Sequence, residues 1–147
     1  MVKKISLLFI LFLFQVAGMN AYAANIEVFH INEGKVVKEV PANDTVHKEV
    51  EGILKGITDI FREFEPIPKS GQMVKIPLDP AIKVENQWFH ALVSEVILIF
   101  PEYENPHLML FDDENNAFFF IFDASVDRIL DELKLKLNER NNSKNSP

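Results

Sequence analysis

The histidines are the first side chains to consider for chemistry, because histidine serves both as a metal ligand and as a general acid or base. The chain has four of them, His30, His47, His90 and His107. None stands in the H-E-x-x-H motif or in another zinc-binding spacing. His47 and Glu51 are four residues apart on a predicted helix and could share a metal ion, but an exposed helix face explains this pair better.

The densest group of oxygen-bearing side chains is the run Asp112–Asn116. Calcium takes carboxylate and amide oxygens of this kind. The run lacks the glycine and the distal glutamate of an EF-hand loop, however, and Asp and Asn are also the residues that a hairpin turn favours. We therefore interpret the run as a turn and predict no metal site.

A pair of carboxylates also stands between two later strands. Glu102 and Glu104 are two residues apart, and paired carboxylates are the groups that hydrolyse glycosidic bonds. His90 or His107 beside one of them would complete a hydrolytic centre. Prolines bracket this acidic loop on both sides, which favours a simple connection between strands.

Motifs for an activated nucleophile are absent from the sequence. There is no cysteine and no G-x-S-x-G motif, and the five glycines form no phosphate-binding loop. Ser70 precedes Gly71 in a proline-bounded loop, which is typical of a turn. The sequence therefore predicts no catalytic residue, no cofactor and no metal ion, and it favours a non-catalytic role over an enzyme.

The N-terminal residues have the three parts of a secretory signal peptide. A basic start is followed by an apolar run over residues 5–18 and by a small-x-small cleavage site at residues 21–23. We predict a cleaved signal peptide over residues 1–23. An uncleaved membrane anchor is the less favoured alternative, because a transmembrane helix needs about 20 apolar residues.

Composition limits the class of the exported chain. The formal net charge is −7 and there is no cysteine. An acidic domain is a poor candidate for nucleic acid or for an anionic membrane, since both demand a basic patch. Exported domains without disulfides are stabilised by packing alone, which is common in bacteria and indicates the bacterial cell envelope or the extracellular space. We predict one domain over residues 24–138 and a disordered polar tail over residues 139–147.

Two β hairpins are predicted near the two ends of the domain. Residues 26–40 contain two runs of strand-forming residues around Asn32–Gly34, where glycine suits a positive φ. Residues 107–111 and 117–122 are apolar runs joined by the acidic turn. The strands predicted between the hairpins cover residues 73–78, 81–85 and 92–100, with a turn at Asp79-Pro80, and residues 88–91 fit either helix or strand.

Two amphipathic helices are predicted from apolar residues that recur at helical spacing. The first begins at Asn43 or Asp44 and ends before Pro66. The second begins near Asp123 or Ser125. These elements predict an α+β domain with a mostly antiparallel sheet built from two hairpins plus short strands, one long amphipathic helix after the first hairpin, and a C-terminal helix. The apolar stripe of the long helix is Val46, Val50, Ile53, Leu54, Ile57, Ile60, Phe61 and Phe64, and that of the C-terminal helix is Val126, Ile129, Leu130, Leu133 and Leu137.

The last strand is apolar on both of its faces, whereas a half-solvated antiparallel strand alternates apolar and polar residues. Phe119 and Ile121 point to one side and the other phenylalanines to the opposite side. The two helices could cover one face each, or lie together on one face and leave the other for a partner, a second copy or an apolar ligand. The candidate interaction face consists of Phe118, Phe120, Phe122, Leu108 and Leu110.

The functional hypothesis is an exported, non-catalytic domain that acts through contact with an unknown protein partner or as a homo-oligomer. One alternative is a carrier or sensor of a small apolar ligand held between the sheet and the long helix. A less favoured alternative is a hydrolase of envelope polymers. The sequence predicts no nucleic-acid partner, and a membrane contact only through an uncleaved signal peptide.

Overall fold

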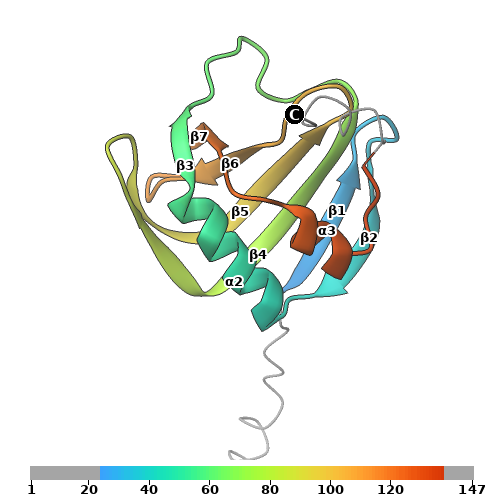
Figure 1. Ribbon diagram of the computed structural model, residues 1–147, viewed down its shortest axis with the longest axis horizontal. Helices are drawn as coiled ribbons and strands as arrows, with labels where there is room; N and C mark the ends of the chain where they lie inside the picture. Colours follow the sequence, from blue (N-terminus) through green and yellow to red (C-terminus); the bar gives the residue numbers. More distant parts are fainter. Residues whose placement is uncertain (1–23, 138–147) are drawn as a thin grey trace, which may run out of the picture.

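Seven strands and two helices make up residues 24–137, the part of the chain that the computed structural model describes (Figure 1). The strands form one sheet in which all neighbours are antiparallel, in the order β2-β1-β4-β5-β6-β7-β3. The predicted α+β class with a mostly antiparallel sheet is therefore confirmed. The bounds are β1 Asn25–His30, β2 Lys35–Pro41, α2 Asp44–Lys55, β3 Ile57–Ile60, β4 Gly71–Glu85, β5 His90–Pro101, β6 His107–Phe111, β7 Ala117–Phe122 and α3 Asp127–Glu132.

Helix α2 begins where the sequence predicts a helix. The side chain of Asn43 caps it, because its Oδ1 accepts a hydrogen bond from the amide of Val46 at 3.0 Å. Its buried side chains are Val46, Val50, Ile53 and Leu54. The helix ends at Gly56, whose amide bonds to the carbonyls of the preceding turn.

The prediction that this helix continues to Pro66 is wrong. Residues Ile57–Ile60 form strand β3, which pairs with β7 at the edge of the sheet. Gly56 lies so close to the end of β7 that an added Cβ would stand 2.9 Å from Asp123 Oδ1. Two β-branched isoleucines and a threonine follow, and such residues favour a strand when a sheet edge is beside them. The apolar residues at helical spacing thus belong to helix α2 up to residue 55 and, at Ile57 and Ile60, to strand β3.

The predicted strands 73–78 and 81–85 are parts of one long strand, β4. The turn predicted at Asp79-Pro80 is instead a bend inside this strand, where the register with β5 shifts between Pro77 and Ile82. Beyond the bend, Asn86 makes the connection to β5, because its Oδ1 accepts hydrogen bonds from the amides of Trp88 and Phe89. Strand β5 then begins at His90, so residues 88–91, which fit either a helix or a strand by sequence, do not form a helix.

Helix α3 is shorter than predicted. It covers Asp127–Glu132, and Ser125 Oγ accepts a hydrogen bond from the amide of Asp127 at its start. Lys134 has a φ of 51°, which turns the chain out of the helical path. The last residue of the predicted stripe, Leu137, still packs against the core from a non-helical segment, together with Leu135.

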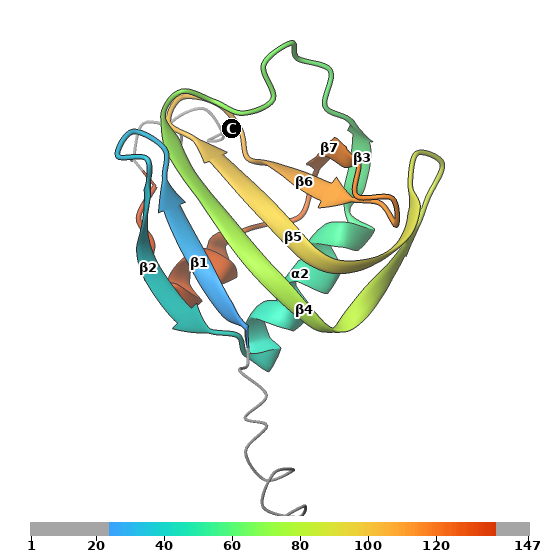
Figure 2. The same ribbon diagram turned by 180° about the vertical axis from the view of Figure 1, so that it is seen from behind.

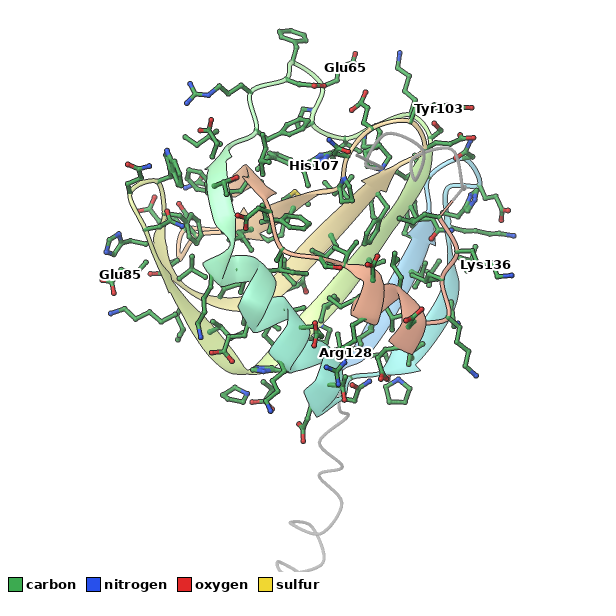
Figure 3. All side chains as sticks on the ribbon, in the orientation of Figure 1. Glu65, Glu85, Tyr103, His107, Arg128 and Lys136 are labelled. Atoms are coloured by element: carbon green, nitrogen blue, oxygen red, sulfur yellow. The ribbon has the colours of Figure 1, made fainter. Side chains whose placement is uncertain are left out.

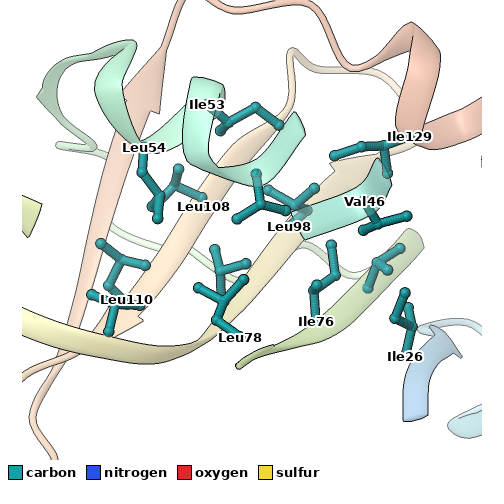
Figure 4. Packing of buried hydrophobic residues seen from close by; sticks show 14 of the residues in the cluster. Ile26, Val46, Ile53, Leu54, Ile76, Leu78, Leu98, Leu108, Leu110 and Ile129 are labelled. Carbon is teal, nitrogen blue, oxygen red and sulfur yellow. The ribbon is translucent and has the colours of Figure 1, made fainter. Parts of the chain in front are cut away.

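Both helices lie on the same face of the sheet (Figures 1 and 2). They are joined by an ion pair between Arg128 and Glu49 at 3.4 Å. The main core fills the space between the helices and the sheet, as the close view of ten labelled side chains in Figure 4 shows. Leu98 in β5 and Ile53 in α2 are almost completely buried there. Of the two arrangements open from the sequence, the structure has both helices on one face.

The predicted signal peptide, residues 1–23, and the predicted tail, residues 139–147, lie outside the described residues. Within residues 24–137, no helix is long and apolar enough to cross a membrane.

Candidate functional site

The five residues of the predicted interaction face line the layer that the helices cover. Leu108, Leu110 and Phe120 are 0 %, 0 % and 1 % exposed and belong to the main core. Phe118 and Phe122 lie nearer the rim, and Phe118 is 37 % exposed. Phe89 packs edge-on against Phe118 and Phe120, with ring centroids 5.4 and 5.5 Å apart. This face therefore meets the chain's own helices and the connection between β4 and β5 over most of its area.

The opposite face of the sheet, called here the outer face, has no helix of the described chain across it (Figure 2). The pairing register places apolar side chains side by side on it, because opposed residues in paired strands point to the same face. An ion pair between Glu27 and Lys75, at 2.8 Å, continues one of these rows. The apolar members of the outer face are Phe29, Val36, Met73, Ile97, Ile99, Met109, Phe111, Phe119 and Ile121.

His107 ends one row of the outer face and anchors the loop of residues 61–70. Its side chain is 2 % exposed, and Nε2 lies 2.6 Å from the carbonyl oxygen of Pro66. A carbonyl can only accept, so Nε2 carries the hydrogen. The ring of Phe61 stacks on the imidazole, with centroids 4.0 Å apart and planes at 9°. His107, one of the histidines considered for catalysis, thus fixes a loop to the sheet.

A cavity of about 410 Å³ lies between this loop and the connection of residues 102–106. Figure 3 shows Glu65, Tyr103 and His107 at the same end of the molecule, at these two loops. The structure brings the predicted Glu102 and Glu104 together with His107 in the cavity wall. The remaining wall residues are Glu63, Phe64, Glu65, Pro66, Pro68, Lys69, Ser70, Pro101 and Tyr103.

His90 is not part of that arrangement. It pairs with Glu85 at 2.8 Å in the exposed hairpin between β4 and β5, and Figure 3 shows Glu85 at the far side from His107. Hydrogen bonds from Lys83 and then His90 hold the pKa of Glu85 below its usual range. Of the two histidines proposed beside the paired glutamates, only His107 is near them, and its Nε2 is occupied by a backbone carbonyl.

His47 and Glu51 do not face a common partner either. His47 Nε2 donates to the carbonyl of Pro80 at 2.8 Å and so ties α2 to the bend of β4. Glu51 accepts a hydrogen bond from Lys55 at 2.9 Å, which lowers the pKa of its carboxyl. Within residues 24–137, no group of three or more His, Asp or Glu side chains is placed to hold a metal ion.

The acidic run between β6 and β7 is organised as a turn around Asp112. Oδ1 of Asp112 accepts from the amides of Glu114 and Asn116 at 3.0 and 2.8 Å, and Oδ2 accepts from Asn116 Nδ2 at 2.9 Å. Asn115 has a φ of 68°, a conformation that asparagine tolerates well. The carboxylate of Asp112 therefore serves the backbone of the hairpin.

Asp112→Ala should destabilise the domain at neutral pH, and the effect should disappear in acid. Hydrogen bonds from Asn116 and Glu114 lower the pKa of Asp112 below its ordinary 3.8, so this carboxylate stabilises the fold above that pH. The stabilisation is lost as the pH falls through the lower, folded-state pKa. Urea unfolding of the wild type and of Asp112→Ala from pH 7 to pH 2 measures this difference in stability. Asp112→Asn is the control, because it keeps one acceptor oxygen. A difference that stays constant over this range would contradict the assignment.

A second cavity, of about 560 Å³, is a cleft between α2 and the bent half of β4. The hydrogen bond from His47 to Pro80 runs along it. The walls are mixed: Leu54, Ile57, Ile82 and Val84 are apolar, while the others include Glu51, Lys55, Lys83 and Glu85. A volume of this size falls in the range of small-molecule sites, about 300–1,000 Å³.

The sequence does not predict that the loop of residues 61–70 packs on His107. The apolar spacing extends the predicted helix to just before Pro66, so it makes Phe61 and Phe64 members of a buried stripe, and only the residues from 65 on are predicted as a loop. The available signal was the cluster of prolines at 66, 68, 101 and 106, since two proline-bounded loops with exposed aromatics are typical of binding loops on a rigid scaffold.

Comparisons of the chain with protein-family models, with curated proteins and with solved structures found no match.

Proposed function

We propose that this chain is an exported, non-catalytic domain of the bacterial envelope or extracellular space that works by protein contact through its outer face. The observation that supports the proposal is the placement of both helices on one side of the sheet, so that no helix of residues 24–137 crosses the apolar opposite face. The loop of residues 61–70 covers the end of that face at His107, while Ile97, Phe111 and Phe119 stay partly exposed on it. Contiguous apolar surface of this kind marks contact sites in soluble proteins.

The outer face has the composition of a contact patch. Ile97, Met109 and Phe119 are neighbours on adjacent strands, and the ion pair of Glu27 with Lys75 supplies a polar border. An apolar centre with a charged rim is the usual anatomy of a protein interface. A second copy of the chain is the first occupant to test, because one apolar face can meet its own copy across a two-fold axis.

Self-association should depend on Ile97. Sedimentation velocity of residues 24–147 over a range of concentrations should show association, and Ile97→Lys should abolish it, because a buried unpaired ammonium opposes contact. Leu92→Lys is the matched control, since Leu92 lies on the same strand, β5, and is already 60 % exposed. A wild-type protein that stays monomeric and binds no dye specific for exposed apolar surface would contradict the proposal.

A second candidate is a carrier of a small ligand, and the cleft between α2 and β4 favours it. Its apolar and charged walls suit an amphiphilic molecule with a short hydrocarbon part. Native mass spectrometry of gently purified protein should detect a co-purified molecule, and Ile82→Trp, which fills the cleft, should remove it. A clean apo mass in both proteins would rule this candidate out.

A further inference from the structure

The loop of residues 61–70 carries a fully exposed aromatic side chain. Phe64 is 100 % exposed, and Ile67 in the same loop is 48 % exposed. On the neighbouring connection, Tyr103 is 65 % exposed. Phenylalanine usually stabilises a fold by being buried, and an exposed one does not. Exposed aromatic residues are often hot spots of protein interfaces.

The surface around these aromatic rings is acidic. Glu63, Glu65, Glu102 and Glu104 contribute to the cavity of about 410 Å³ between the loops, and Lys69 is the one basic residue that residues 24–137 contribute to its wall. Carboxylates gathered around one hollow raise the local concentration of cations and steer them to it. Aromatic faces add to this attraction, because Lys and Arg are held over the rings of Phe and Tyr.

Both loops are fixed in place rather than left to adjust. The amide of Phe61 donates to the carbonyl of Phe119 at 2.9 Å, and the amide of Glu102 donates to the carbonyl of Ser70 at 3.3 Å. His107 holds Pro66 at the centre of the longer loop. Prolines restrict the backbone further. A preorganised surface loses little conformational entropy on binding, which favours affinity.

His107 also contributes an acceptor that has no donor. Since Nε2 donates to Pro66, the neutral ring carries its lone pair on Nδ1. Nδ1 is buried and has no hydrogen-bond partner among the described residues, and the ring forms part of the cavity wall. The site thus combines carboxylates, a carbonyl-bound imidazole and aromatic faces. Such a site favours a molecule with N–H donors and positive charge.

We propose that the loops of residues 61–70 and 102–106 dock a segment of a partner protein that carries Lys or Arg beside an apolar residue. The cationic side chain enters the acidic cavity, and its apolar neighbour covers Phe64 and Ile67 on the rim. A free small cation would leave that apolar rim exposed. The inference rests on the proposed function as a contact domain, but it uses residues separate from the Ile97 region of the outer face.

The test is a titration of ¹⁵N-labelled protein, residues 24–147, with a hexapeptide of alternating Arg and Leu. The expected result is saturable shifts of amides in residues 61–70 and 102–107, weakened by added salt. A hexapeptide of alternating Glu and Leu should give none. Equal shifts with the acidic peptide, equal shifts with spermidine, or no loop shifts at millimolar basic peptide would each overturn the proposal.

Variants separate the two contributions to this binding. Phe64→Ala and Glu65→Gln should each weaken the basic peptide by about tenfold, as expected for the loss of a hot-spot contact. Leu92→Ala, which removes an exposed apolar side chain on the far hairpin, should leave the affinity unchanged. Equal affinities in all three variants would place the peptide elsewhere.

The Ile97→Lys protein distinguishes this inference from the proposed function. If the outer face associates as proposed, that variant is monomeric and still binds the peptide at the loops. Loss of loop binding with intact self-association refutes the loop proposal alone. If the wild type never self-associates but still binds the peptide at the loops, only the proposed contact between copies through the outer face is refuted.

Discussion

Gly71→Ala is expected to cost the domain about 3 kcal/mol or more in its free energy of unfolding, and with it most of its soluble yield. Gly71 has a φ of 120°, a region that side chains rarely adopt. A Cβ built there would stand 2.2 Å from the carbonyl oxygen of Phe100. That oxygen belongs to the paired strand β5, so it cannot move aside without opening the sheet.

The same position also joins three segments of the chain. The carbonyl of Gly71 accepts from the amide of Ile31 at 3.0 Å, and its amide donates to Asn32 Oδ1 at 3.1 Å. Any backbone shift that relieves the clash therefore breaks the contact of the first hairpin with the start of β4. Small domains have only about 5–15 kcal/mol of total stability, so a loss of this size is a large fraction.

Gly52→Ala is the matched control for this prediction. Gly52 is exposed inside helix α2, and a Cβ there would meet nothing within 4 Å. Alanine has the higher helix propensity, so this variant should gain up to about 1 kcal/mol. Urea unfolding followed by circular dichroism compares the three proteins. A Gly71→Ala protein as stable as Gly52→Ala would contradict the assigned backbone geometry.

The strand content was predictable because pairs of apolar residues two apart recur in the segments that became β1, β4, β5, β6 and β7. The end of α2 was not predictable by the same means. Ile57, Ile60 and Phe61 continue a helical spacing, yet they also suit an edge strand that pairs with β7. The pairing with β7 and the close packing of Gly56 against Asp123 favour the strand, and these contacts join residues far apart in the sequence.

Which face of the sheet is covered could not be predicted either. Alternation along a strand shows which side chains share a face, and that grouping agrees with the structure, where Phe120 is buried under the helices and Phe118 and Phe122 lie nearer the rim of the same face. Alternation contains no information on where the helices lie, because both helices are amphipathic and could cover either face. In the structure both helices lie on one face, and Phe119 lies on the outer face beside Met109.

Phe120→Ala and Phe119→Ala should therefore have different consequences, although the residues are adjacent and identical. Phe120 is 1 % exposed under the helices, and its truncation should lower the free energy of unfolding by about 3–5 kcal/mol. Phe119 is half-buried on the outer face beside Met109, so its truncation should cost much less, on the order of 1 kcal/mol.

The effects of the two substitutions on self-association should have the opposite order. Phe119→Ala removes an aromatic ring from the proposed contact and should weaken self-association, whereas folded Phe120→Ala, assayed well below its lowered melting temperature, should associate as the wild type does. Urea unfolding and sedimentation velocity on the same two variants separate the roles. If both substitutions destabilise the fold equally and neither changes association, the outer face is an ordinary part of the core and not a contact surface, because removing an aromatic ring from the centre of an interface is expected to weaken binding.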